Sequence, residues 1–301
     1  MNEKATSAAD RLLKAIDVDG RFRLFACVTT GIADEACRLH GTSPTASAAL
    51  GRALTGGALL GALLKDRQRV ALKFQGNGPI KKIIVEADNS GALRGFTAVP
   101  EADAPLRDGK LNVSGVLGRE GFLTVIRDEG FNEPYQGTVK LKTGEIAEDL
   151  AYYLTESEQT PSAVGLGVYV EPNGTVAAAG GFLIQTLPPP DEEIIDRLVE
   201  RLKALPAITT LLRRGLGPEG LLNSILQETP FRILEDLPLI LFCPCKRSMI
   251  ERVLISLGRV EIQRLIDEEE TVEVTCEFCR TAYCFQKDEM EAILSEIGDA
   301  R

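Results

Sequence analysis

The sequence predicts an α+β protein with three parts: a mixed α/β core domain, a helical connector and a small C-terminal domain. Strand and helix patterns do not alternate as regular βαβ units, which argues against a doubly wound sheet. Three consecutive prolines at 188–190 interrupt the pattern, because proline cannot continue a strand ladder. Five of the seven cysteines lie beyond residue 242. We therefore expect a core domain at 1–187, a connector at 188–237 and a C-terminal domain at 238–301.

The composition excludes several classes of protein. The chain is 44% hydrophobic and 26% charged, as is usual for globular proteins. Its 34 basic and 44 acidic residues give a net charge of −10, which disfavours binding to nucleic acid. The longest uncharged apolar run, 53–64, is shorter than the roughly 20 residues that span a bilayer, and the first residues do not resemble a signal peptide. We expect a soluble cytoplasmic protein without membrane contact.

The clearest pattern in the core domain predicts an Ala- and Leu-rich helix at 42–65. Ser43 is a suitable N-cap for this helix, and Pro44 suits its first position. Its glycines lower helix propensity but would permit close packing against a sheet. Alternating patterns predict strands at 69–75, 80–88, 92–98, 122–128, 136–141, 163–170 and 175–187, and a further helix at 145–157.

The connector is predicted to be helical from 191 to about 237. Acidic residues at 191–193 suit a helix N-terminus, and Pro206 ends the first helix. A second helix is expected at 218–227. Apolar residues recur at helical spacing along one face of the first helix. This face is either core packing or a binding surface, and its members are Ile194, Ile195, Leu198, Val199 and Leu202.

The C-terminal domain contains the clearest chemical motif. Cys243-Pro244-Cys245 (the CxC pair) is followed after thirty residues by Cys276-Glu277-Phe278-Cys279 (the CxxC pair). Two close pairs of cysteines supply the four ligands of a tetrahedral structural zinc site. Because His40 is the one histidine, four thiolates are the natural ligand set. We expect one Zn²⁺ per chain, among helices at 247–258, 259–269 and 287–298 and strands at 271–278 and 281–286.

Two other functions for these cysteines stay open at this point. A constitutive zinc ribbon could support an interaction or nucleic-acid-binding module, although ribbons favour CxxC in both halves and acids at 267–270 adjoin this one. A thiol–disulfide oxidoreductase could use Cys276 and Cys279 as its redox pair. Reactive CxxC motifs, however, usually begin a helix in a thioredoxin-like context, whereas this one lies between two strand patterns.

The cysteine spacing resembles that of the heat shock protein 33 family (33 kDa chaperonin). The stretches Tyr135-Gln136-Gly137, 152–168 with Ser157-Glu158-Gln159, and 180–190 also resemble motifs of the family's core domain. The resemblance implies a non-enzymatic, ATP-independent holdase that binds unfolding proteins under oxidative stress. It implies that the reduced, zinc-bound form is inactive. Disulfides Cys243–Cys245 and Cys276–Cys279 would then release zinc, unfold the connector and expose the face defined above for clients.

The resemblance also implies dimers of the oxidised form and transfer of clients to ATP-dependent foldases. It gives no role to Cys27, Cys37 or Cys284, for which we expect buried, apolar environments. His40 is expected to be solvated or to cap a helix. The loop 76–78 is expected to be a strand turn, since it lacks the Lys and Ser/Thr of a phosphate-binding loop, and no nucleotide cofactor is expected.

Overall fold

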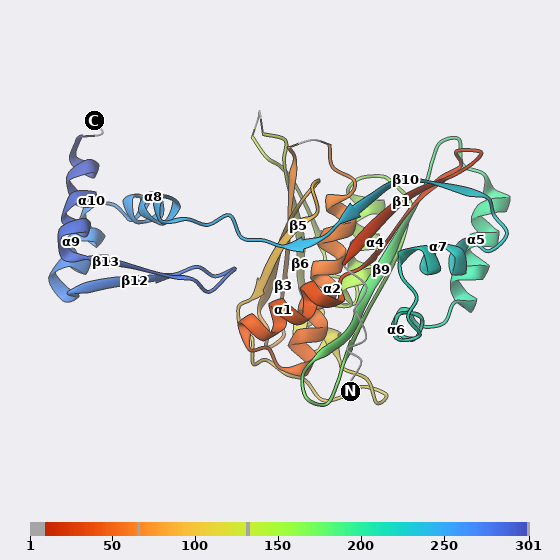
Figure 1. Cartoon of the computed structure of the whole chain (residues 1–301), viewed down its shortest axis with the longest axis horizontal. Helices are drawn as coiled ribbons and strands as arrows, with labels where there is room; N and C mark the ends of the chain where they lie inside the picture. Colours follow the sequence, from red (N-terminus) through yellow and green to blue (C-terminus); the bar gives the residue numbers. More distant parts are fainter. Residues whose placement is uncertain (1–9, 66, 131–132, 300–301) are drawn as a thin grey trace, which may run out of the picture. The chain divides into compact units, whose positions relative to one another are not determined.

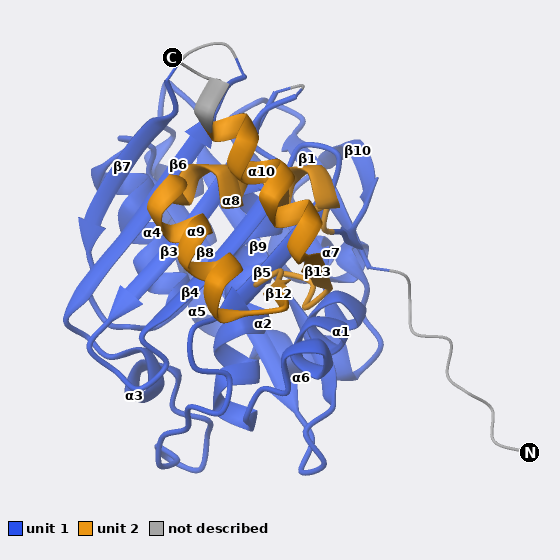
Figure 2. Cartoon of the chain, turned by 90° about the vertical axis from the view of Figure 1, so that its left-hand side faces the viewer, with its two compact units in different colours: residues 1–242 blue, residues 243–301 orange. Residues whose placement is uncertain are grey.

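The computed structural model describes residues 10–65, 67–130 and 133–299. The chain divides into two compact units, residues 1–242 and 243–301, which Figure 2 shows in different colours. Each unit has its own apolar core. In the part of the chain that the model describes, no helix has the length and apolar character needed to cross a bilayer. The fold mixes helices and strands, which confirms the α+β expectation.

The first unit contains two β-sheets (Figure 1). One has the strand order β10-β1-β2-β9-β8, and its paired strands are all antiparallel. The other has the order β11-β5-β4-β3-β6-β7, in which only β11 and β5 run parallel. The strands are β1 (Arg11–Asp17), β2 (Phe22–Val28), β3 (Arg69–Gly76), β4 (Lys82–Asp88), β5 (Ala92–Thr97), β6 (Gly121–Asp128), β7 (Tyr135–Lys140), β8 (Ser162–Val170), β9 (Val176–Thr186), β10 (Phe231–Pro238) and β11 (Ile240–Leu241).

Helix α2 (Pro44–Gly61) packs against strands of both sheets and forms the centre of the main core. Sixteen of its eighteen residues are buried. The Ser43 hydroxyl accepts a hydrogen bond from the Ala46 N–H at 3.1 Å, and Pro44 takes the first turn, as the sequence predicts. The remaining helices of this core are α1 (Thr30–His40), α3 (Val113–Leu117) and α4 (Ile146–Glu156).

The opposite face of the five-stranded sheet is covered by the helices α5 (Glu192–Ala204), α6 (Ile208–Arg213) and α7 (Pro218–Leu226). Successive residues of β1 show the two-sided burial, because Leu12 belongs to the main core whereas Leu13 packs beneath these helices. Asp191 caps α5 by accepting a hydrogen bond from the Ile194 N–H at 3.1 Å. The three helices thus close a second core that the sheet alone would leave open to solvent.

The structure corrects the expectation that helix continues to residue 237. Residues 231–238 form strand β10, which pairs with β1, and Ile240 and Leu241 pair with β5. The end of the connector therefore belongs to the five-stranded sheet, and Ile240 and Leu241, expected in the C-terminal domain, belong to the six-stranded sheet. The exposed apolar side chains of β10, such as Ile233 and Leu234, do not alternate with buried ones, so the period-2 signal of a strand is absent.

An ion pair links the two sheets of the first unit. Arg127 on β6 lies 2.5 Å from the carboxylate of Glu158, which precedes β8, and both side chains are largely buried. Burial and the adjacent Glu158 carboxylate raise the pKa of Tyr153. Removing one partner of a buried pair leaves an uncompensated charge, which costs more than losing a pair on the surface.

We expect Glu158→Gln to lower the free energy of unfolding of the first unit by about 1–2 kcal/mol, because Arg127 keeps its charge without a partner. Urea unfolding followed by circular dichroism measures this change. Glu200→Gln is the matched control, since Glu200 pairs with Lys203 at a highly exposed position and should cost at most about 0.5 kcal/mol. Equal effects of the two substitutions would contradict the prediction.

The second unit is smaller and has a separate apolar core. It contains the helices α8 (Arg247–Leu257), α9 (Arg259–Glu268) and α10 (Lys287–Asp299) and the antiparallel pair β12 (Thr271–Thr275) and β13 (Ala282–Gln286). All five elements occur where the sequence predicts them. The core lies between the helices and the hairpin, and its members are Ile250, Leu254, Ile262, Ile266, Val272, Phe285, Met290, Ile293 and Leu294.

Candidate metal centre

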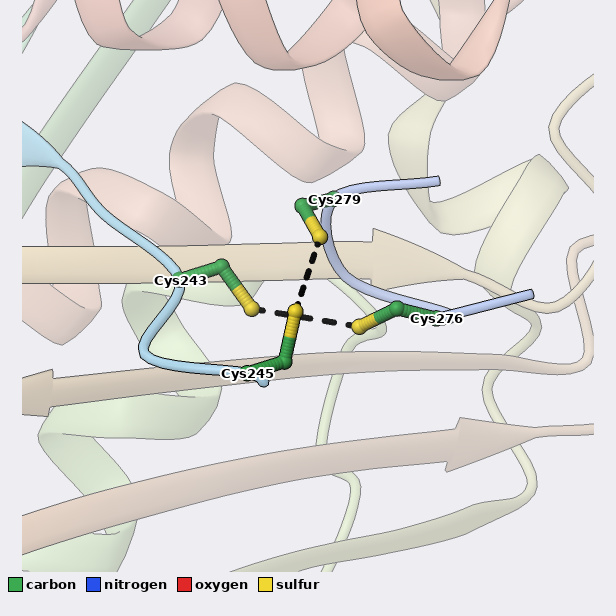
Figure 3. A group of neighbouring side chains, drawn as sticks. All are labelled: Cys243, Cys245, Cys276 and Cys279. Atoms are coloured by element: carbon green, nitrogen blue, oxygen red, sulfur yellow. Dashed lines mark hydrogen bonds between the residues drawn. The ribbon is translucent and has the colours of Figure 1, made fainter. Parts of the chain in front are cut away.

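Four cysteines of the second unit meet in one cluster (Figure 3). Cys243 and Cys245 lie on the segment before α8, and Cys276 and Cys279 lie on the turn between β12 and β13. Their sulfur atoms all lie within 4.8 Å of one another. The closest contacts join Cys243 to Cys276 at 3.8 Å and Cys245 to Cys279 at 3.2 Å. The sequence therefore identified a set of residues that the fold brings together.

The hairpin turn holds the CxxC pair in place by backbone hydrogen bonds. The Cys276 N–H donates to the Thr281 carbonyl at 2.9 Å, and the Arg280 N–H donates to the Cys276 carbonyl at 2.8 Å. Arg280 adopts a left-handed conformation with φ of 57°, which turns the chain back into β13. The strand register, with Thr275 opposite Ala282, closes the hairpin directly beside the cysteines.

Two hydroxyl groups extend the cluster beyond sulfur. The Tyr283 hydroxyl lies 3.2 Å from the Cys245 sulfur, and the Thr281 hydroxyl lies 3.2 Å from the Cys279 sulfur. The sequence analysis missed both residues. The signal was available, because residues two and four positions after the second cysteine of the CxxC pair both carry a hydroxyl group.

The thiols differ in acidity. Burial raises the pKa of Cys245 to about 12; the hydrogen bond to Tyr283 acts to lower it, and the hydrogen bonds to the other three cysteines act to raise it. Burial also acts to raise the pKa of Cys279, but hydrogen bonds from Thr281 and from Cys245 and Cys276 lower it to about 6. The Cys279 thiolate is therefore stabilised by its neighbours. Deprotonation of all four cysteines would place four negative charges together, so it requires a compensating cation.

The cluster fits a tetrahedral metal ion with sulfur ligands. Zn–S bonds of about 2.3 Å imply sulfur–sulfur separations of roughly 3.8 Å. This value lies within the observed spacing, which runs from 3.2 Å for Cys245 and Cys279 to at most 4.8 Å. Thiolate ligands favour soft or borderline metals such as zinc over the hard cations calcium and magnesium. The four cysteines could thus hold one metal ion, and their geometry is compatible with zinc.

The other three cysteines occupy different surroundings. Cys27 and Cys37 are buried in the core of the first unit, as expected, and burial raises the pKa of both thiols. The expectation was wrong for Cys284, which is exposed. Adjacent residues of a strand point to opposite faces. Tyr283 points to the face of β13 that contacts Cys245, so Cys284 points to the other face.

The loop 76–78 is a tight turn, as the sequence predicts. The Gly76 N–H donates to the Lys81 carbonyl, the Asn77 N–H to Glu120 and the Gly78 N–H to Leu117. A phosphate would need these same N–H groups, so the turn does not have the free donors of a phosphate-binding loop. His40 is the last residue of α1, where a cationic or donor side chain suits the helix C-terminus.

Comparison with known proteins assigns the fold and the cysteine cluster to one family. A family model described as Hsp33 protein matches residues 10–286, a range that includes all four cysteines. The chain belongs to the Hsp33 family. It is 57% identical over 292 residues to a 33 kDa chaperonin of Geobacter sulfurreducens, covering 97% of both chains. It is 44% identical over 289 residues to that of Bacillus cytotoxicus, covering 96% of this chain and 99% of the relative.

A solved structure of the family has the same fold throughout. The crystal structure of a 33 kDa chaperonin (heat shock protein 33 homologue) from Thermotoga maritima matches with a TM-score of 0.90 and 33% sequence identity. The match covers 97% of this chain and 100% of that one. Membership of the Hsp33 family supports a chaperone function.

The face of α5 that the sequence singled out is mostly covered in this structure. Ile194 and Leu198 are buried in the second core, and Ile195 and Leu202 pack against it. Val199 is the exception, with 41% of its surface exposed. These residues therefore serve as core packing here, which is the first of the two uses that the sequence allows.

Proposed function

We propose that this protein is a redox-regulated, ATP-independent holdase that binds unfolding client proteins during oxidative stress. Its reduced form would be inactive and would hold one Zn²⁺ through Cys243, Cys245, Cys276 and Cys279. The observation that best supports this proposal is the cluster of four cysteine sulfurs within 4.8 Å in a chain of the Hsp33 family. Because such a switch needs reduced thiols at rest, we propose a cytoplasmic location.

The proposed activation is oxidation of the two cysteine pairs by a peroxide. In each pair, two thiolates lose two electrons and form one disulfide, and one molecule of hydrogen peroxide takes up these electrons and two protons from the solvent to give two molecules of water. A disulfide needs sulfurs at about 2.05 Å, so its formation withdraws two ligands from the cluster. The pairs proposed are Cys276–Cys279, which oxidises first, and Cys243–Cys245, whose smaller ring contains Pro244.

Loss of the metal would unfold the second unit, since small metal-binding units derive their folding free energy from the metal. We propose that the connector then loosens and that α5 exposes its apolar face. Ile194, Ile195, Leu198, Val199 and Leu202 would bind apolar surface on unfolding clients. The oxidised protein would form dimers and pass its clients to ATP-dependent foldases, without enzymatic activity of its own.

Oxidation should convert the protein from inactive to active in suppressing aggregation. We expect the peroxide-treated protein to suppress light scattering by a heat-denatured model client, and the reduced protein to leave it unchanged. Cys284→Ser is the matched control, because Cys284 is exposed and lies outside the cluster. The Cys284→Ser variant should respond to peroxide as the unmodified chain does. In a Cys276→Ser, Cys279→Ser variant, suppression of light scattering should no longer depend on peroxide.

Three results would contradict the proposal. Equal suppression by reduced and oxidised protein would exclude a redox switch. Retention of both metal and thiols after peroxide treatment would favour a constitutive zinc ribbon, and cycling of one pair without metal would favour an oxidoreductase.

A further inference from the structure

The Tyr283 hydroxyl is one of two hydroxyl contacts of the cysteine cluster that neither the ligand set nor the disulfide pairs account for. It lies 3.2 Å from the Cys245 sulfur. Of the contacts that described residues make with this sulfur, the hydroxyl is the one donor that is not another sulfur. The CxxC pair differs, because turn N–H groups of Phe278, Cys279 and Thr281 donate to its two sulfurs.

The two residues that follow Tyr283 hold β13 against the segment of the CxC pair. Arg247, two residues after Cys245, donates a hydrogen bond to the Cys284 carbonyl at 2.8 Å. The same guanidinium lies over the Phe285 ring, 4.1 Å from its centre. The Tyr283 ring itself packs against the core of the second unit. The hydroxyl is thus directed at Cys245 by a braced strand and a packed ring.

The direction of the hydrogen bond follows from the chemistry of a ligand sulfur. A metal-bound cysteine carries no proton, so Tyr283 must be the donor and Cys245 the acceptor. Hydrogen bonds from groups around a metal site orient its ligands and stabilise their charge. A sulfur that shares its electron density with a donor is also a weaker nucleophile towards peroxide.

We propose that Tyr283 is a positioning residue of the CxC pair, holding Cys245 in its ligand geometry and slowing both metal release and oxidation at that pair. This inference rests on the proposed function, because it concerns the same metal centre. Thr281 holds the corresponding position for Cys279, where backbone donors already act.

Tyr283→Phe removes the hydroxyl and keeps the packed ring, so it tests the proposal with little disturbance of the fold. Competition between the reduced, zinc-loaded protein and a chromogenic chelator should show zinc affinity reduced roughly 10–100-fold. Mass spectrometry after timed exposure to peroxide and thiol alkylation should show faster modification of Cys245 and Cys243. Circular dichroism of the zinc-loaded variant verifies that the fold is retained.

Thr281→Val is the matched control, because it removes the other hydroxyl of the cluster. It should leave the peroxide reaction of Cys245 unchanged and act on Cys279 alone. Tyr283→Phe with unchanged zinc affinity and unchanged reactivity of Cys245 would overturn the proposal, as would equal acceleration at all four cysteines. Absence of zinc from the unmodified reduced chain would instead refute the metal centre of the proposed function, so the two failures are distinguishable.

Discussion

Chelation of zinc under reducing conditions should unfold residues 243–301, loosen the connector and leave the core domain at 10–187 folded. The second unit has a core of nine buried apolar side chains, which is little for an independent fold. Zinc binding supplies about 10–16 kcal/mol in small structural sites, and this free energy is also the folding free energy of the unit. The first unit has two larger cores and no part in the cysteine cluster.

Limited proteolysis with hydrogen exchange measures the effect along the chain. After chelation, protection should disappear from β12, β13 and α8–α10, while α2 and strands β1 to β9 keep theirs. Protons compete with the metal for the thiols, and the pKa of Cys245 is raised. A fixed amount of chelator should therefore remove more metal as the pH falls. Digestion spread uniformly over both units would show that the division is wrong.

Gly61→Val should destabilise the first unit by about 2–3 kcal/mol, because a side chain at this position overpacks the core. A Cβ atom there would lie 2.9 Å from the Asp88 carbonyl oxygen and 3.1 Å from the Ala87 side chain. The nearer atom is sheet backbone, which cannot move away as the end of a flexible side chain would. Helix propensity alone predicts the opposite sign, a gain of a few tenths of a kcal/mol.

Thermal or urea unfolding of the first unit measures this difference, with Thr155→Val as the control. Thr155 lies on an exposed position of α4, where valine should change stability by no more than about 0.5 kcal/mol. A stabilising effect of Gly61→Val would show that propensity outweighs packing in α2, and that its glycines do not serve the close approach of helix and sheet.

The sequence predicted most local elements because their signals are local. Ser43 and Pro44 mark the start of α2 by cap chemistry, and the alternation of β3 and β4 reflects sheets with one buried face. No element was expected at residues 11–40, which form β1, β2 and α1. Strand β2 is buried on both faces, so its apolar run lacks the alternation that identifies a strand.

The candidate metal centre was accessible from the sequence for the same reason. Ligand pairs with only one and two residues between them are brought together by the local chain, and the nearly complete lack of histidine left cysteine as the ligand. Tyr283 and Thr281 were not identified, since their role depends on the register and facing of β13 and not on spacing alone.

By itself, the sequence determined which residues could meet at a metal and where most helices and strands begin and end, because caps, periodicity and ligand spacing act over a few residues. Only the tertiary structure decided that 231–241 joins both sheets of the first unit, that α5 buries most of its apolar face, and that Cys284 is exposed. Those outcomes depend on strand pairing and burial between segments far apart in the sequence, or on opposite faces of one strand. No short stretch of sequence carries that information.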